Sequence, residues 1–185
     1  MTTEEAVDRI LEAETAPDRR LRIFAALLGS ESGLGTQGLT VVGGSAIEIY
    51  TNGAYVSGDI DLVVSNRVPV CEVLRRWGFK DEGKLWVKDR LGLFVDLLGP
   101  YESGSRRLTR IVQTKFGDIR LAAVEDLLLK RLREARYWKQ RPALAQAVLL
   151  LRIAGSDLDW EYIAFFAQRD AIEDLVKFVR KQSKA

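Results

Sequence analysis

The apolar positions of this chain follow two different periods, and the changes of period predict its organisation. Up to Leu28, apolar residues recur every three or four positions, which is typical of amphipathic helices. We expect the first helix to begin at Thr2 or Thr3, just ahead of two glutamates that favour a helix start, and the second at Asp18. A stretch rich in Gly and Ser, Gly29 to Gly38, then predicts a turn.

The middle of the chain consists of short apolar runs bounded by turn residues, which predicts strands. Two short helices are expected among them, after Gly44 and after Val68, and from Val124 onward the period is helical again. This order predicts an α+β fold, with a core in residues 1–123 and a helical region in residues 124–185 packed on it. The expected strands are 39–42, 58–64, 85–88, 91–98, 108–114 and 119–122.

Composition narrows the chemistry that such a fold can carry. Hydrophobic residues make up 47% and charged residues 29% of the 185 residues, as in an ordinary globular protein. The net charge of +2 is too small to imply a general coat of nucleic acid. The chain has no histidine, which excludes Ser-His-Asp triads, Cys-His dyads and histidine-bound zinc. An enzyme built from this sequence must therefore use carboxylates, hydroxyls, lysine and arginine.

The compartment follows from two further features. Cys71 is the single cysteine, so an internal disulfide is impossible and a reducing cytoplasm fits best. The amino terminus has no basic segment followed by an apolar one, and no apolar run approaches the roughly 20 residues that span a bilayer. We therefore expect a cytoplasmic protein without a membrane partner.

The segment from Gly58 to Val64 places two carboxylates in an apolar strand. Because side chains alternate faces, Asp59 and Asp61 are expected on one face, about 7 Å apart at their Cα atoms, while Ile60 and its alternate neighbours face the core. Like charges so close are costly unless a cation lies between them or one carboxylate is protonated. The pair predicts a divalent metal site, since Mg²⁺ prefers carboxylate oxygens together with substrate phosphates. The alternative is two ordinary acids on a solvent-facing edge strand.

Gly43, Gly44 and Ser45 stand between an expected strand and an expected helix. Two glycines let the backbone approach a ligand closely, and the amino terminus of a helix offers free N–H groups to phosphate. Ser45 is expected to cap that helix or to contact phosphate, because both roles use the same hydroxyl. Alone, such a step is more often a tight turn; an Asp-x-Asp strand about a dozen residues later strengthens the phosphate-site interpretation.

Asp96 interrupts the apolar run Leu93 to Leu98. A buried carboxylate without a partner costs several kcal/mol, so Asp96 must have one. If its strand lies beside that of Asp59 and Asp61, the three acids can bind two metals about 3.5–4 Å apart, an arrangement that serves in-line displacement at phosphorus. The alternative is that Asp96 is the buried partner of a nearby arginine.

The order of these motifs resembles the signature of the DNA polymerase beta-like nucleotidyltransferase superfamily: Gly43-Gly44-Ser45, then Gly58-Asp59-x-Asp61, then Asp96. The helical part is similar to the tail of a poorly characterised prokaryotic nucleotidyltransferase group, distantly related to AbiEii-type toxins. That similarity is carried by segments 131–138, 146–147, 158–162 and 165–167, and the two resemblances together span roughly residues 35–175. The AbiEii-like pattern has a further Arg-Asp pair, whereas Tyr137 follows Arg136 here, so the substrate side departs from the pattern.

The resemblance implies a nucleotidyltransferase-like mixed sheet flanked by helices, with a helical C-terminal part. It implies transfer of a nucleoside monophosphate from an NTP to an acceptor hydroxyl, with Mg²⁺ or Mn²⁺ held by the three acids. Gly43, Gly44 and Ser45 would then hold the phosphates. Lys130 belongs to a basic helix whose charges are expected to be mostly solvated, and it is a candidate to reach the triphosphate.

The acceptor and the biological role stay open at this stage. The superfamily modifies tRNA ends, proteins and small molecules, so each of these is an acceptor to consider. Two alternatives to a working enzyme are a catalytically weak nucleotide-binding module and the toxin of a toxin–antitoxin pair. The corresponding partners would be an antitoxin or further copies of this chain in a homo-oligomer.

Overall fold

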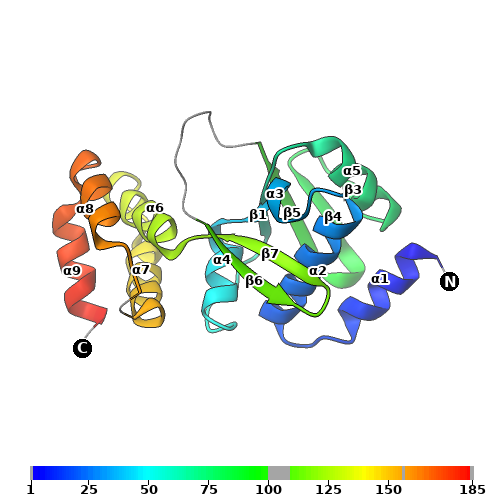
Figure 1. Cartoon of the computed structure of the whole chain (residues 1–185), viewed down its shortest axis with the longest axis horizontal. Coiled ribbons are helices and arrows are strands. Elements are labelled where there is room, and N and C mark those ends of the chain that lie inside the picture. The colour runs from blue at the N-terminus through cyan, green and yellow to red at the C-terminus, as the bar shows by residue number, and fades with distance from the viewer. Residues whose placement is uncertain (1, 100–108, 156, 184–185) are drawn as a thin grey trace. The chain divides into compact units, whose positions relative to one another are not determined.

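The computed structural model describes residues 2–99, 109–155 and 157–183, and the chain divides into two compact units, residues 1–122 and 123–185. The first unit is an α+β structure built around a seven-stranded mixed sheet with the strand order β3-β4-β5-β2-β1-β7-β6 (Figure 1). The strands are β1 (Leu39–Val41), β2 (Ile60–Val64), β3 (Lys80–Asp81), β4 (Leu85–Lys88), β5 (Leu93–Leu98), β6 (Thr109–Thr114) and β7 (Gly117–Ala122).

The centre of the sheet combines parallel and antiparallel pairs. β2 is parallel to β5 and antiparallel to β1, and β1 is parallel to β7. Since side chains alternate along each strand, one face of these strands carries only apolar residues toward the helices. Val41, Leu62 and Val95 lie on this face and are fully buried. The other face carries the polar residues Asp61 and Asp96 described below.

The helices of the first unit are α1 (Thr3–Glu12), α2 (Pro17–Glu31), α3 (Gly35–Gly38), α4 (Gly43–Tyr50) and α5 (Arg67–Arg76), with a 3₁₀ turn η1 (Asp89–Leu91). α2 packs on β7, α4 and α5, and α4 packs on β2. Phe24 of α2 contacts Trp77 edge-on, with ring centroids 6.0 Å apart, and both rings are buried. This aromatic contact anchors α2 in the core.

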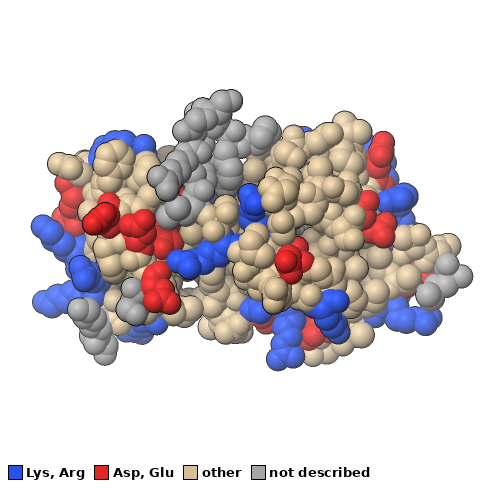
Figure 2. Space-filling view, in the orientation of Figure 1, with Lys and Arg blue, Asp and Glu red and all other residues tan. Residues whose placement is uncertain are grey.

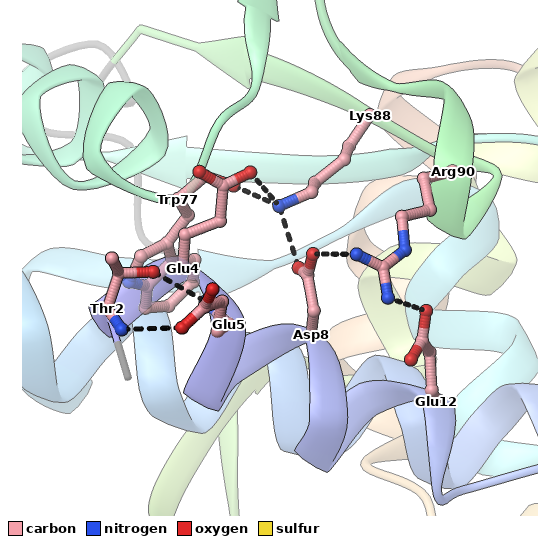
Figure 3. A network of polar contacts seen from close by, with 8 residues as sticks. All are labelled: Thr2, Glu4, Glu5, Asp8, Glu12, Trp77, Lys88 and Arg90. Carbon is pink, nitrogen blue, oxygen red and sulfur yellow. Dashed lines mark hydrogen bonds and ion pairs between the residues drawn. The ribbon is translucent and has the colours of Figure 1, made fainter.

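A polar network attaches α1 to the rest of the unit (Figure 3). Thr2 and Glu5 form a reciprocal capping box at the start of the helix. One turn further on, Asp8 is buried and its carboxylate lies 2.7 Å from the ammonium of Lys88 in β4. The helix buries Val7 and Leu11, and the Asp8–Lys88 ion pair joins it to β4.

The second unit consists of α6 (Val124–Tyr137), α7 (Arg141–Ala154), α8 (Trp160–Arg169) and α9 (Glu173–Ser183). α6 packs on α7 and α8, and α7 packs on α9. Arg133 pairs with Asp170 at 2.7 Å between α6 and the end of α8. Burial raises the pKa of Asp170, but hydrogen bonds from Arg169 and Arg133 lower it more, so the net pKa lies below its ordinary value.

The structure confirms the expected α+β class and corrects several boundaries. α2 continues to Glu31, so the first residues of the expected Gly–Ser turn are helical, and residues 35–38 form α3. β2 begins at Ile60, and β5 begins at Leu93 because η1 precedes it. Strand β3 was not expected, and the expected strand start at Leu108 lies outside the described residues. Within the described ranges, no helix is long and apolar enough to cross a membrane.

Candidate active site

Two carboxylates meet on neighbouring strands in the middle of the sheet. Asp61 of β2 and Asp96 of β5 are register partners in a parallel pair, so their Cα atoms are separated by roughly one strand spacing of 4.8 Å and their side chains share a face. Asp59 stands in a bend one residue before β2, and its Oδ1 lies 3.5 Å from the hydroxyl of Ser57. The expected site required the strand of Asp96 to lie beside the strand of Asp61, and the two strands are neighbours.

The carboxylate of Asp61 lies directly against the start of α4. The backbone N–H of Gly44 donates to Asp61 Oδ2 at 3.3 Å, so a carboxylate faces the positive end of the helix. A Cβ built on Gly43 would lie only 2.1 Å from the same oxygen, and Gly43 has a φ of +59°. Glycine is therefore required at this position both by the backbone conformation and by the approach of Asp61.

Gly44 has a corresponding reason for being glycine. A Cβ there would lie 2.5 Å from Ser57 Oγ, in the loop that leads to Asp59. The sequence pattern predicted that these glycines let a backbone approach a ligand closely. In the structure, the groups that approach them are the protein's own Asp61 and Ser57 side chains.

Ser45 does not cap α4. The residue at the capping position is Val42, without a side-chain hydrogen bond, and Ser45 lies inside the first turn. Its buried hydroxyl donates to the carbonyl of Val42 at 2.8 Å and accepts from the backbone N–H of Asp61 at 3.1 Å. The expectation that Ser45 caps α4 is therefore wrong. Its hydroxyl joins the start of α4 to β2 instead.

Glu48 organises the loop between α4 and β2 from inside. It is 3% exposed, and its Oε2 accepts a hydrogen bond of 2.6 Å from the backbone N–H of Ser57. Burial raises the pKa of Glu48 above its ordinary value; the Ser57 hydrogen bond lowers it, and repulsion from Asp18 adds to the rise. The segment that carries Ser57 and Asp59 is thus held by a buried carboxyl group that sequence reasoning did not single out.

Asp96 has the partner that its burial demands. It is 7% exposed, and its Oδ2 lies 3.5 Å from the ammonium of Lys84, whose side chain is 80% exposed. Lys84 stands just before β4, and the register of β4 with β5 sets Leu85 opposite Asp96. This cation was missed because its proximity depends on an antiparallel pairing that no local pattern of the sequence encodes.

Arg120 is a second cation on the face of the sheet that carries Asp61. It is the register partner of Thr40, which pairs with Val63, two residues from Asp61 on the same side of β2. The Nε atom of Arg120 is buried and has no hydrogen-bond partner among the described residues. Its guanidinium group is a candidate to bind an anionic oxygen.

Lys130, the basic residue expected near the triphosphate, belongs to α6 of the second unit. Its Nζ lies 3.9 Å from the carboxylate of Glu134, one turn further along the helix, and its side chain is half exposed. This contact is compatible with the solvated basic face that was the alternative, and a phosphate contact of Lys130 stays a prediction.

The donors present have the chemistry that Mg²⁺ or Mn²⁺ requires. Asp61 and Asp96 offer carboxylate oxygens on one face, and such a cation commonly uses one or two carboxylates and completes its shell with water and substrate phosphates. Among the described residues, no three acidic or sulfur side chains are gathered closely enough to hold a metal on their own. Asp61 and Asp96 would therefore need oxygens from a substrate and from water to complete a metal site.

The charged side chains on the visible surface are mixed in sign. On the face shown in Figure 2, acidic and basic side chains are interspersed over both units, in keeping with 28 basic and 26 acidic residues in the chain. Recognition of an anionic substrate would thus depend on individual cations such as Lys84 and Arg120.

No family model, curated protein or solved structure matches this chain. What the site can do therefore follows from its own residues. Asp61 and Asp96 are register partners on one face of the sheet, and Asp61 approaches the glycines at the start of α4. Lys84 lies beside Asp96, and Arg120 belongs to the same face of the sheet.

Proposed function

We propose that this protein is a nucleotidyltransferase that moves a nucleoside monophosphate from an NTP to the hydroxyl of an acceptor, with Mg²⁺ or Mn²⁺. The observation that carries the proposal is the register of Asp61 with Asp96, which brings two carboxylates to one face beside the start of α4. The order of glycine and acid motifs, which resembles the DNA polymerase beta-like superfamily, supports the same reaction.

In the proposed reaction, the acceptor oxygen forms a bond to the α-phosphorus as the bond to the bridging oxygen breaks, and pyrophosphate leaves. The acceptor's proton passes to a carboxylate, for which Asp96 is the candidate. Asp59 and Asp61 would hold the metal that screens the triphosphate, and that metal would supply charge neutralisation at the phosphoryl oxygens. Arg120 and the N–H group of Gly43 would bind the phosphates, and the N–H of Gly44 would join them once a metal draws the Asp61 carboxylate away from it.

The test is transfer of label from each α-labelled NTP, with Mg²⁺ or Mn²⁺, to the components of a cell extract. We expect one nucleotide to label one class of acceptor, and we expect Asp61→Asn to abolish the label. Asp118→Asn is a matched control, because Asp118 is an exposed acid on the β6–β7 hairpin. Labelling that persists in Asp61→Asn, or is lost equally in Asp118→Asn, would contradict the assignment.

A specific observation also favours a nucleotide-binding module without transfer as the second candidate. Asp61 is already hydrogen-bonded by Gly44, and Asp96 is paired with Lys84, so both acids are compensated without a metal. Calorimetry and the label-transfer assay together separate the two functions. A module binds NTP with metal but labels no acceptor in any extract, whereas the enzyme does both.

A further inference from the structure

A cavity of about 200 Å³ opens beside Asp59, between α2, α4 and the starts of β2 and β5. We call it the Glu48 cavity; its walls include Pro17, Arg20, Glu48, Val56, Asp59 and Phe94. At roughly 30 Å³ per water, it holds the volume of about seven waters. This is below the 300 Å³ or more that is typical of pockets for drug-sized ligands, so only a compact molecule or one group of a larger molecule fits.

The walls of the Glu48 cavity combine exposed apolar surface with buried polar groups. Val56 and Phe94 are both large apolar residues exposed to solvent, and both line this one cavity. Clustered exposed apolar residues mark a binding surface more often than single ones do. The buried carboxyl group of Glu48 lines it as well, held by the N–H of Ser57.

The charges of the lining select against anions. Glu48 and Asp59 contribute two carboxyl groups, and the one cation among the lining residues is Arg20, whose guanidinium already donates to the carbonyl of Leu91. A phosphate or carboxylate placed here would be repelled, whereas hydroxyl and ammonium groups would find acceptors. The cavity itself is therefore not expected to hold the triphosphate.

We propose that the Glu48 cavity binds a compact neutral or cationic compound bearing a hydroxyl group, and that this compound is the acceptor. The first half stands on the cavity alone, and the second rests on the proposed function. Asp59 lies in the cavity wall and precedes Asp61 by two residues in the chain, so a hydroxyl bound in the cavity would lie beside the chain segment that carries these two proposed metal ligands. Its oxygen would bond to the α-phosphorus, its proton would pass to a carboxylate, and pyrophosphate would leave.

The probes for the test are ethanolamine, glycerol and glycerate, which are similar in size and carry positive, no and negative charge. Saturation-transfer NMR on the full-length protein is expected to show binding of ethanolamine and glycerol but not of glycerate. Glu48→Gln keeps an acceptor for the Ser57 N–H but loses the charge. It should therefore lower the affinity for ethanolamine by about tenfold and change the affinity for glycerol little. Equal binding of glycerate, or no binding of any probe, would overturn the proposal.

A filling substitution tests the location. Gly58 lines the cavity, has no left-handed φ, and an added Cβ there meets no atom within 4 Å, so Gly58→Leu can fill the space without backbone strain. Gly99→Leu is the matched control, because Gly99 has the same freedom and does not line the cavity. We expect Gly58→Leu to reduce probe binding at least about tenfold and Gly99→Leu to leave it unchanged. Probe binding that survives Gly58→Leu would refute the location.

Metal-dependent NTP binding, measured by calorimetry in the same proteins, separates the two proposals. Gly58→Leu should keep NTP binding while it loses the probes. Wild-type protein that binds the probes but no NTP would leave the cavity standing and refute the proposed function. Wild-type protein that binds NTP but no probe would do the reverse.

Discussion

The ion pair between Lys88 and Asp8 gives the sharpest prediction of stability. Lys88 is 5% exposed and Asp8 is 2% exposed, and their charged atoms lie 2.7 Å apart (Figure 3). Lys88 also contacts Glu4 at 3.1 Å and donates to the carbonyl of Trp77, which closes the network between α1, α5 and β4. Lys88→Met removes the cation from a site that water hardly reaches.

The magnitude follows from what remains around Asp8. Removing one partner of a buried pair typically costs about 3–5 kcal/mol, because the other charge stays buried. Arg90 lies 3.5 Å from Asp8 but is mostly exposed, so it compensates only in part, and we expect a loss of about 3 kcal/mol. For a chain of this size that corresponds to a decrease in Tm of about 6–12 °C.

Urea unfolding followed by circular dichroism measures the effect, with an unchanged m-value as the sign that the folded state is otherwise intact. Lys80→Met is the control, because Lys80 pairs with Asp89 at 3.6 Å on the surface and should cost at most about 1 kcal/mol. The double variant Lys88→Met/Asp8→Leu should recover most of the loss, since no buried charge remains. A loss below about 1 kcal/mol for Lys88→Met, or a double variant no better than the single one, would refute this reasoning.

Four further predictions concern the site. Mg²⁺ or Mn²⁺ should raise the Tm of the wild-type protein, and Asp61→Asn should abolish most of the rise; equal shifts in both would place the metal elsewhere. Asp96→Ala should keep metal-dependent NTP binding, measured by calorimetry, but slow transfer by several powers of ten. Equal losses of NTP binding and of transfer would contradict the role of Asp96 at the acceptor. Lys84→Gln should tighten Mn²⁺ binding because its ammonium, 3.5 Å from Asp96, competes for that carboxylate, and Lys80→Gln should not. Burial raises the pKa of Glu48 in the folded state, so the folded protein binds this proton more tightly than the unfolded chain does. Stability should therefore fall as pH rises from the ordinary pKa to the raised one. Over this pH range, the urea midpoint should decrease less in Glu48→Gln than in the wild-type protein.

Local patterns of the sequence determined the elements of this protein and the nature of its candidate site. Alternation in strands and the three-to-four period in helices depend on neighbours in the chain, so β2, β5 and the C-terminal helices were predictable. Gly43, Gly44 and Asp61 were predictable as site residues for the same reason. They belong to a local signature, in which a strand is followed by glycines at a helix start and then by acids in an apolar strand.

Only the tertiary structure decided which of these residues meet. The register of Asp61 with Asp96, the approach of Lys84 to Asp96 and the burial of Ser45 against β2 all depend on pairing between segments far apart in the chain. A shift of one residue in such a pairing would turn a carboxylate to the other face while leaving every local pattern intact. The Glu48 cavity depends on the same long-range packing, because no single segment of the chain contains its walls.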